Sequence, residues 1–257
     1  MNAVSRALMT PLVAWLTEES ARPGQPLCDY ARICEKLQPS DVLLVEGRTR
    51  VSGVIQAVTL SSWSHAALYI GTAGRLRERW PALARHRLPR WADDEHLLVE
   101  AELGQGTVIM PLSRYRDHHL RICRPAYLTE QDSEQVIQYA VQRLGTRYDL
   151  RQILDLLRFF FPYGLLPRRW RSSLFAVSAG EPTRTVCSTL IARAFSSVDY
   201  PVLPRLERQP DGRYAYRRRN PKLFTPRDFD YSPYFNIIKY PFMGEDAARY
   251  REMDWLP

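Results

Sequence analysis

One cysteine of this sequence stands where a protein can activate a thiol. Cys187 lies in a polar approach that is followed by apolar residues at helical spacing, so we expect a helix over 186–195 that begins at the thiol. Unpaired N–H groups and the positive end of the helix dipole stabilise a thiolate there and lower its pKa below the usual value of about 8.5. A buried cysteine that only packs is the alternative, but the neighbouring Ser188 and Thr189 hydroxyls favour a polar cleft.

A histidine and a carboxylate on two predicted strands could complete this thiol. His65 lies early in a strand over 64–71, and Glu100 interrupts the apolar residues of a strand over 96–102. Burying a carboxylate without a partner is costly, so a histidine on the neighbouring strand is an attractive partner whose tautomer the carboxylate would fix. Glu102 shares the face of Glu100 and competes for this role. A structural histidine and a strand-end charge in solvent are the alternative interpretations.

The elements that must position these residues follow from hydrophobic patterning. Compact apolar runs between turn signals predict strands at 41–46, 64–71, 96–102, 107–112 and 118–124, and the last four are expected to form an antiparallel sheet. Helical spacing predicts helices at 54–60, at 130–144 after the N-cap Thr129, and at 150–161. Residues 72–95 show no clean periodicity and are predicted as an insertion loop. The chain from Asp199 onward is predicted as loops with one late strand over 235–240.

Composition limits the class of protein. The chain has 257 residues, 45% of them hydrophobic and 25% charged, which excludes disordered and fibrous classes. Four cysteines are too few for a disulfide framework and form no Cys-x-x-Cys pair, so we expect a reducing compartment. Neither a metal site nor a dinucleotide site is predicted, because no His, Cys or Asp spacing resembles a metal site and Gly104-x-Gly106 lacks the third glycine and the helix of a nucleotide loop.

The net charge of +8 is concentrated in the second part of the chain. Residues 151–257 carry 18 basic and 11 acidic side chains, and an excess of basic charge favours an anionic partner. The segment 159–171 joins bulky apolar residues to three arginines, a composition typical of a membrane interface, although core packing followed by a loop also explains it. No apolar run reaches the ~20 residues of a membrane span, and Pro11 interrupts the N-terminal run, so neither a transmembrane helix nor a signal peptide is predicted.

Four segments, in this order, resemble the motifs of a known family. They are Ser64-His-Ala-Ala-Leu-Tyr-Ile-Gly71, Val99-Glu-Ala101 with Gly106-Thr-Val, Gly145-Thr-Arg-Tyr-Asp149, and Val186-Cys-Ser188. Together they are similar to the YiiX/YebB-like cysteine hydrolases, in the circularly permuted branch of the NlpC papain-like superfamily, which is related to lecithin retinol acyltransferase. The resemblance covers roughly residues 38–200. The order His, Glu, Cys is the order of the permuted branch, whereas papain-like enzymes place the cysteine first.

The resemblance implies an α+β fold of the permuted papain type, in which an antiparallel sheet packs against helices. It implies Cys187 as nucleophile, His65 as general base and acid, and Glu100 as the orienting third member. Ser64, Ser188 and Tyr148 are expected to contact substrate, and packing of Tyr148 on the core is an open alternative. We expect an N-terminal helical arm over 1–37, a catalytic domain over 38–200, and a basic extension over 201–257 packed on that domain.

The expected activity is cysteine-dependent hydrolysis or acyl transfer through an acyl-enzyme, without metal or organic cofactor. The substrate is expected to be a peptide amide or a lipid acyl group. A catalytically silent binding or membrane-associated module that keeps the fold is the alternative function. We expect a cytoplasmic location, peripheral attachment to an anionic inner-membrane surface and no nucleic-acid partner, because no nucleic-acid-binding fold accompanies the basic and aromatic run 213–219.

Overall fold

The structure is a computed structural model of the 257-residue chain. It describes residues 11, 14–19, 28–81, 85, 88, 91–102, 105–146 and 186–238. The predicted helix over 150–161, the segment 159–171 and Tyr148 lie outside these residues. None of the described helices is long and apolar enough to span a bilayer.

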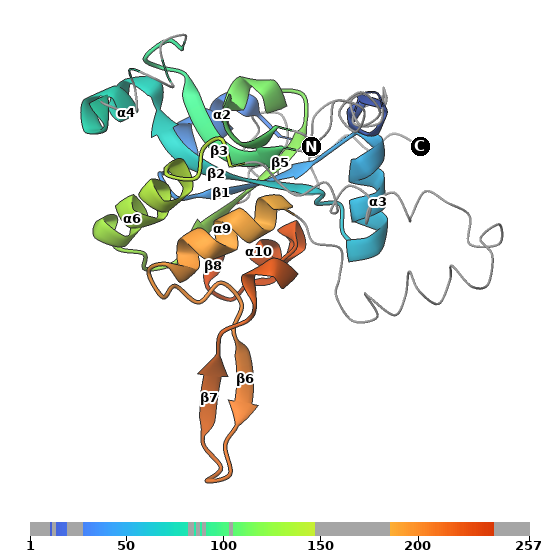
Figure 1. Cartoon of the computed structure of the whole chain (residues 1–257), viewed down its shortest axis with the longest axis vertical. Coiled ribbons are helices and arrows are strands. Elements are labelled where there is room, and N and C mark those ends of the chain that lie inside the picture. The colour runs from blue at the N-terminus through green and yellow to red at the C-terminus, as the bar shows by residue number, and fades with distance from the viewer. Residues whose placement is uncertain are drawn as a thin grey trace, which may run out of the picture.

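The centre of the molecule is a six-stranded sheet in which every neighbouring pair is antiparallel (Figure 1). Across the sheet the strands are β4 (Gly106–Pro111), β3 (His96–Glu102), β2 (His65–Thr72), β1 (Val42–Glu46), β5 (His119–Pro125) and β8 (Phe235–Ile238). The predicted antiparallel sheet is confirmed, but β4 and β5, which follow each other in the chain, lie on opposite sides of the β1–β2–β3 centre. η1 (Leu112–Tyr115) lies between them in the chain.

Alternate residues of β2 enter two different hydrophobic clusters. Ala66, Leu68 and Ile70 pack in the larger cluster with α6 (Glu130–Val141), α9 (Val186–Ser196) and α10 (Pro226–Tyr231). Ala67 and Tyr69 pack in the smaller cluster with α2 (Tyr30–Lys36) and η1. Both faces of the central strands are therefore buried, which explains their nearly continuous apolar sequences.

Most helices begin at a side chain that satisfies their first N–H groups. Asp29 caps α2, Thr49 caps α3 (Arg50–Thr59) and Thr129 caps α6, each by accepting a hydrogen bond from a backbone N–H of the first turn. The Thr129 cap was predicted. The α3 helix begins four residues before the predicted 54–60 because Thr49 supplies the cap.

The prediction of a loop over 72–95 is wrong at its start. Residues Ala73–Arg79 form helix α4, whose N-cap Thr72 accepts a hydrogen bond from the Arg75 N–H. Only Ala73 and Leu76 of this helix are buried, and Gly74 lies against Asp93. Two inward-facing residues in seven are too few to give a recognisable helical period.

The tail also holds more structure than predicted. The late strand at Phe235 is confirmed as β8, but the chain before it forms the hairpin of β6 (Arg205–Arg208) and β7 (Tyr214–Arg217), η4 (Pro221–Leu223) and α10. A capping box between Thr225 and Asp228 begins α10. Phe229 and Phe235 enter the same core cluster as α9, so part of the basic extension packs on the helix that carries Cys187.

Candidate active site

Cys187 lies in the first turn of α9, as the sequence pattern predicts, and is 4% exposed. The helix crosses the sheet face formed by β2 and β3 (Figure 1), and its apolar residues Leu190, Ile191 and Ala194 pack in the larger core cluster. This packing fixes the start of α9 against the sheet. The thiol is therefore held in the first turn of a helix that packs on the sheet.

His65 and Glu100 lie where β2 and β3 separate. The β2–β3 ladder covers Leu68 to Thr72 of β2, whereas β1 pairs with β2 as far as Val45↔His65 and β4 pairs with β3 as far as Glu102↔Gly106. At this end β2 therefore still pairs with β1 and β3 still pairs with β4, although β2 and β3 no longer pair with each other. The separation leaves room between them for the His65 ring, whose Nε2 lies 2.8 Å from the Glu100 Oε2.

Glu100 is completely buried and is held from several sides. Its Oε2 accepts a second hydrogen bond from the Tyr115 Oη at 2.7 Å, and the Arg114 guanidinium lies 3.5 Å from its Oε1. Glu102 forms an ion pair with Arg114 instead of contacting His65. Of the two carboxylates that competed at the sequence level, the structure therefore brings Glu100 to the histidine.

The electrostatics of the pair favour a charged thiolate and a charged imidazolium. Burial alone would raise the pKa of Cys187, but the neighbouring His65 and a backbone hydrogen bond from Ala66 outweigh it and lower the pKa. Burial alone would lower the pKa of His65, but Cys187 and Glu100 raise it well above its ordinary value. The two shifts have opposite sign, because each group in its charged form stabilises the charged form of the other.

The contacts of the ring assign its two nitrogens. The Nε2–H group donates a hydrogen bond to the Glu100 carboxylate. The other ring nitrogen, Nδ1, is therefore left for the hydrogen bond between His65 and Cys187. A carboxylate, an imidazole and a thiol connected in this order can generate a nucleophile and return a proton to a leaving group. The arrangement fits acyl-transfer chemistry.

A family model matches residues 36–157, and its description is "Permuted papain-like amidase enzyme, YaeF/YiiX, C92 family". The predicted family resemblance is confirmed. The matched range includes His65, Glu100 and the expected pocket residue Tyr148, whereas Cys187 lies beyond it. The fold class is α+β of the permuted papain-like type, as predicted. The family description supports a hydrolase and an amide substrate.

Among solved structures, the chain is similar to the metalloprotein yiiX from Escherichia coli O157:H7. The identity is 14%, the TM-score is 0.46, and the alignment covers 80% of this chain and 98% of that chain. No curated protein matches. Within the described part of the chain, no group of three or more His, Cys, Asp and Glu side chains is arranged to hold a metal ion.

The two serines that were expected to contact substrate are both buried. The Ser188 Oγ lies 3.9 Å from the Cys187 Sγ, so Ser188 contacts the thiol directly. The Ser64 Oγ accepts a hydrogen bond from the Gly47 N–H at 2.9 Å, and a Cβ on Gly47 would lie only 2.7 Å from this oxygen. Ser64 thus joins the ends of β1 and β2, and its position gives no support to a substrate contact.

Sequence reasoning missed Tyr115 and Arg114. Both lie in η1, outside any strand or motif of the family, and they reach Glu100 because the chain between β4 and β5 passes over the small-cluster face of the sheet. The one signal that could have found them is general: a buried carboxylate with one histidine partner needs further donors. That argument predicts donors but not their positions.

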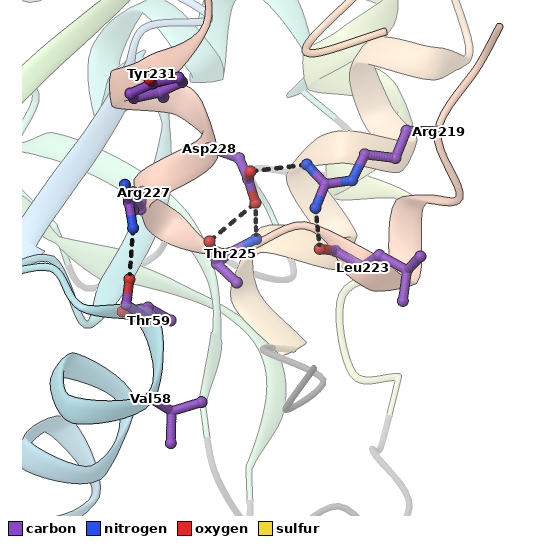
Figure 2. Close-up of a pocket in the computed structure, with 8 residues that line it drawn as sticks. All are labelled: Val58, Thr59, Arg219, Leu223, Thr225, Arg227, Asp228 and Tyr231. Carbon is purple, nitrogen blue, oxygen red and sulfur yellow. Dashed lines mark hydrogen bonds and ion pairs between the residues drawn. The ribbon is translucent and has the colours of Figure 1, made fainter. Parts of the chain in front are cut away.

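Two cavities among the described residues lie elsewhere on the molecule. One of about 840 Å³ is lined by α4, α6 and the buried ion pair of Asp41 with Arg124, and the other of about 260 Å³ lies between the end of α3 and α10. Figure 2 shows that both arginines of the smaller cavity already have partners: Arg219 bonds Asp228, and Arg227 donates to the Thr59 carbonyl. Cys187, His65 and Glu100 line neither cavity.

Proposed function

We propose that the protein is a cysteine-dependent amidase in which Cys187 is the nucleophile, His65 the general acid and base, and Glu100 the residue that positions His65. The observation that carries this proposal is the connected set Glu100–His65–Cys187, in which the pKa of the thiol is lowered and that of the imidazole is raised. The family description favours an amide over the lipid acyl group that also fits the chemistry.

The reaction would proceed in two steps. The Cys187 thiolate attacks the carbonyl carbon, the C–N bond breaks, and the His65 imidazolium gives its proton to the leaving nitrogen, which leaves a thioester. A water molecule then attacks the thioester, His65 takes its proton, and the thiolate departs as the acid is released. The Cys187 backbone N–H at the start of α9 is suited to stabilise the oxyanion, because helix N-termini leave such donors unpaired.

The proposal is tested by intact-mass detection of the acyl-enzyme. Incubation with peptidoglycan peptide fragments should add an acyl mass to the wild-type protein and none to Cys187→Ala. A separate incubation with a lipid extract distinguishes a lipid acyl substrate, and a thiol or amine acceptor in the mixture distinguishes transfer from hydrolysis. If neither substrate class gives an adduct or a product, the catalytically silent module with the same fold becomes the better interpretation.

Tyr115 should act as a second positioning residue, through Glu100. Its hydroxyl donates to the ionised carboxylate and helps to lower the pKa of Glu100, which burial would otherwise raise. Tyr115→Phe should lower kcat about tenfold with little change in KM, because a hydrogen bond to a charged acceptor contributes roughly 1.5–3 kcal/mol and only part of it changes in the transition state. The acid side of the pH–rate profile should move to higher pH, because Glu100 would then protonate more easily.

Tyr69→Phe is the matched control for this variant. Tyr69 is buried on the same side of the sheet, and its hydroxyl hydrogen-bonds the His96 Nδ1 at 2.7 Å, away from Glu100. The Tyr69→Phe substitution also removes one hydrogen bond of a buried tyrosine hydroxyl, and it should leave the pH–rate profile unchanged. Identical profiles for the two variants would assign Tyr115 a packing role only.

A cytoplasmic location with peripheral attachment to an anionic membrane is also part of the proposal. It is supported by the net charge of +8 and by the excess of basic residues after position 150. This part is independent of the amidase chemistry.

A further inference from the structure

The hairpin of β6 and β7 projects from the body of the molecule, beyond α9 and α10 (Figure 1). It forms its own two-stranded sheet, with the register Arg205↔Arg217, Leu206↔Tyr216, Glu207↔Ala215 and Arg208↔Tyr214. Asp211 and Gly212, which has a φ of 83°, lie in the turn. An isolated two-stranded hairpin is only marginally stable in water, so a surface that packs on this exposed hairpin would stabilise it.

The two faces of the hairpin differ. Directly opposed residues share a face, so Leu206, Tyr216, Tyr214 and Arg208 lie on one side, while Arg205, Glu207, Ala215 and Arg217 lie on the other. Leu206 is 56% exposed, Tyr214 64% and Tyr216 70%. We call the first side the tyrosine face. It presents an aliphatic and two aromatic side chains to solvent beside a cation.

The hairpin and its base are strongly basic. Residues 205–219 contain six arginines and two acidic residues. Arg213 and Arg217 form ion pairs within the hairpin, with Asp211 and Glu207 respectively. Arg205 and Arg208 are exposed and form no ion pair with any residue that the structure describes. Their charges are available to an external anion.

We propose that the β6–β7 hairpin docks the protein on an anionic lipid surface, with the tyrosine face and its Arg208 at headgroup depth. Arg205, on the opposite face, adds long-range attraction to the lipid phosphates. Tyrosine has an apolar ring and a polar tip that suit this depth, and guanidinium groups match phosphate oxygens. The turn is polar, so the hairpin would lie along the surface and not insert by its tip. A second copy of this chain is a poor occupant because two basic hairpins repel.

This inference rests on the membrane part of the proposed function and names the element responsible for it. It does not depend on the amidase. The segment 159–171, which the sequence suggested for this role, lies outside the described residues, so the two elements must be compared by experiment.

The test is co-sedimentation of the full chain with vesicles of phosphatidylcholine that contain phosphatidylglycerol. Wild type should bind at low salt and dissociate as salt rises, because exposed charges are screened within a Debye length. The double variant Arg205→Glu/Arg208→Glu should lower the partition coefficient at least about 25-fold, since each basic residue near an anionic surface contributes about fivefold. Leu206→Ala/Tyr214→Ala should weaken binding at every salt concentration.

The matched control is Arg75→Glu/Arg193→Glu, which makes the same charge change at exposed arginines of α4 and α9. It should have a much smaller effect than the hairpin variant. The proposal would be overturned by equal effects of the hairpin and control variants or by equal binding to neutral and anionic vesicles. It would also be overturned by tighter binding to single-stranded nucleic acid than to anionic vesicles. Loss of binding by Arg168→Glu/Arg169→Glu/Arg171→Glu with none by the hairpin variants would likewise overturn it.

Folding and catalysis are separated in the same experiment. The hairpin variants should keep the wild-type melting temperature, because the substituted residues are exposed. Cys187→Ala should bind vesicles like wild type, and the hairpin variants should still react with a soluble amide substrate. Failure of the amidase would therefore leave the vesicle result interpretable.

Discussion

Replacing Cys187 with alanine should abolish turnover of an amide substrate, and His65→Ala should have nearly the same effect. Each change removes a group that bonds to the reacting atoms or moves the proton, so kcat/KM should fall on the order of 10⁴-fold or more. The double variant should lose little beyond either single variant, because members of one catalytic unit are strongly non-additive. The measurement is steady-state hydrolysis, with thermal melting to show that each variant folds.

Cys34→Ala is the control for loss of a thiol. Cys34 is half-buried in α2, and burial raises its pKa, so it has neither the position nor the ionisation of Cys187. Its replacement should leave kcat/KM unchanged. Additive losses in the double variant, or substantial turnover by Cys187→Ala, would show that Cys187 and His65 do not act together.

Much of this site could be predicted from the sequence because its elements are locally determined. The strands that carry His65 and Glu100 are buried on both faces and so appear as short apolar runs. The helix of Cys187 shows an amphipathic pattern whose polar start coincides with the thiol. The charge of Glu100 inside such a run is informative, because only a paired carboxylate is tolerated there.

The remaining parts depend on contacts between distant segments. Glu100 and Glu102 share a strand face, and the choice between them depends on where β2 and β3 separate and on Arg114, which pairs with Glu102. The position of Tyr115 depends on the path of the chain from β4 to β5 across the sheet. Sheet order is set by such crossovers and leaves no periodic trace in the sequence.

The β6–β7 hairpin was missed for a different reason. Its strands are exposed and rich in arginine, so they lack the apolar signal by which strands are recognised. The turn signal was present, because Asp211-Gly212 is a favoured hairpin dipeptide. A search for turns before strands would have found it.

The second large effect concerns the ionisation of Cys187 in the free protein. The alkylation rate of Cys187 should reach half its maximum below the pH expected of an ordinary thiol, because His65 lowers the pKa of this thiol. In His65→Ala the midpoint should move to higher pH, because burial raises the pKa of the thiol and only the hydrogen bonds from Ala66 and Ser188 still oppose it. Glu100→Gln should give an intermediate midpoint, since it keeps the shape of the side chain but removes the charge that supports the imidazolium.

The midpoint is the correct observable because the rate at a single pH combines two opposing effects. A lower pKa increases the thiolate fraction but decreases the nucleophilicity of each thiolate, so the rates of wild type and His65→Ala at neutral pH can be similar. At acid pH the comparison is clear: a thiol of pKa 8.5 is only about 0.03% ionised at pH 5, whereas a thiol whose pKa the imidazolium lowers keeps a larger thiolate fraction. Cys123, whose pKa burial raises far above the ordinary value, serves as an internal control that should not react. If Cys187 of the folded wild type titrates near 8.5, the thiolate–imidazolium pair is absent from the free protein. The proposed amidase would then lose its main physical support.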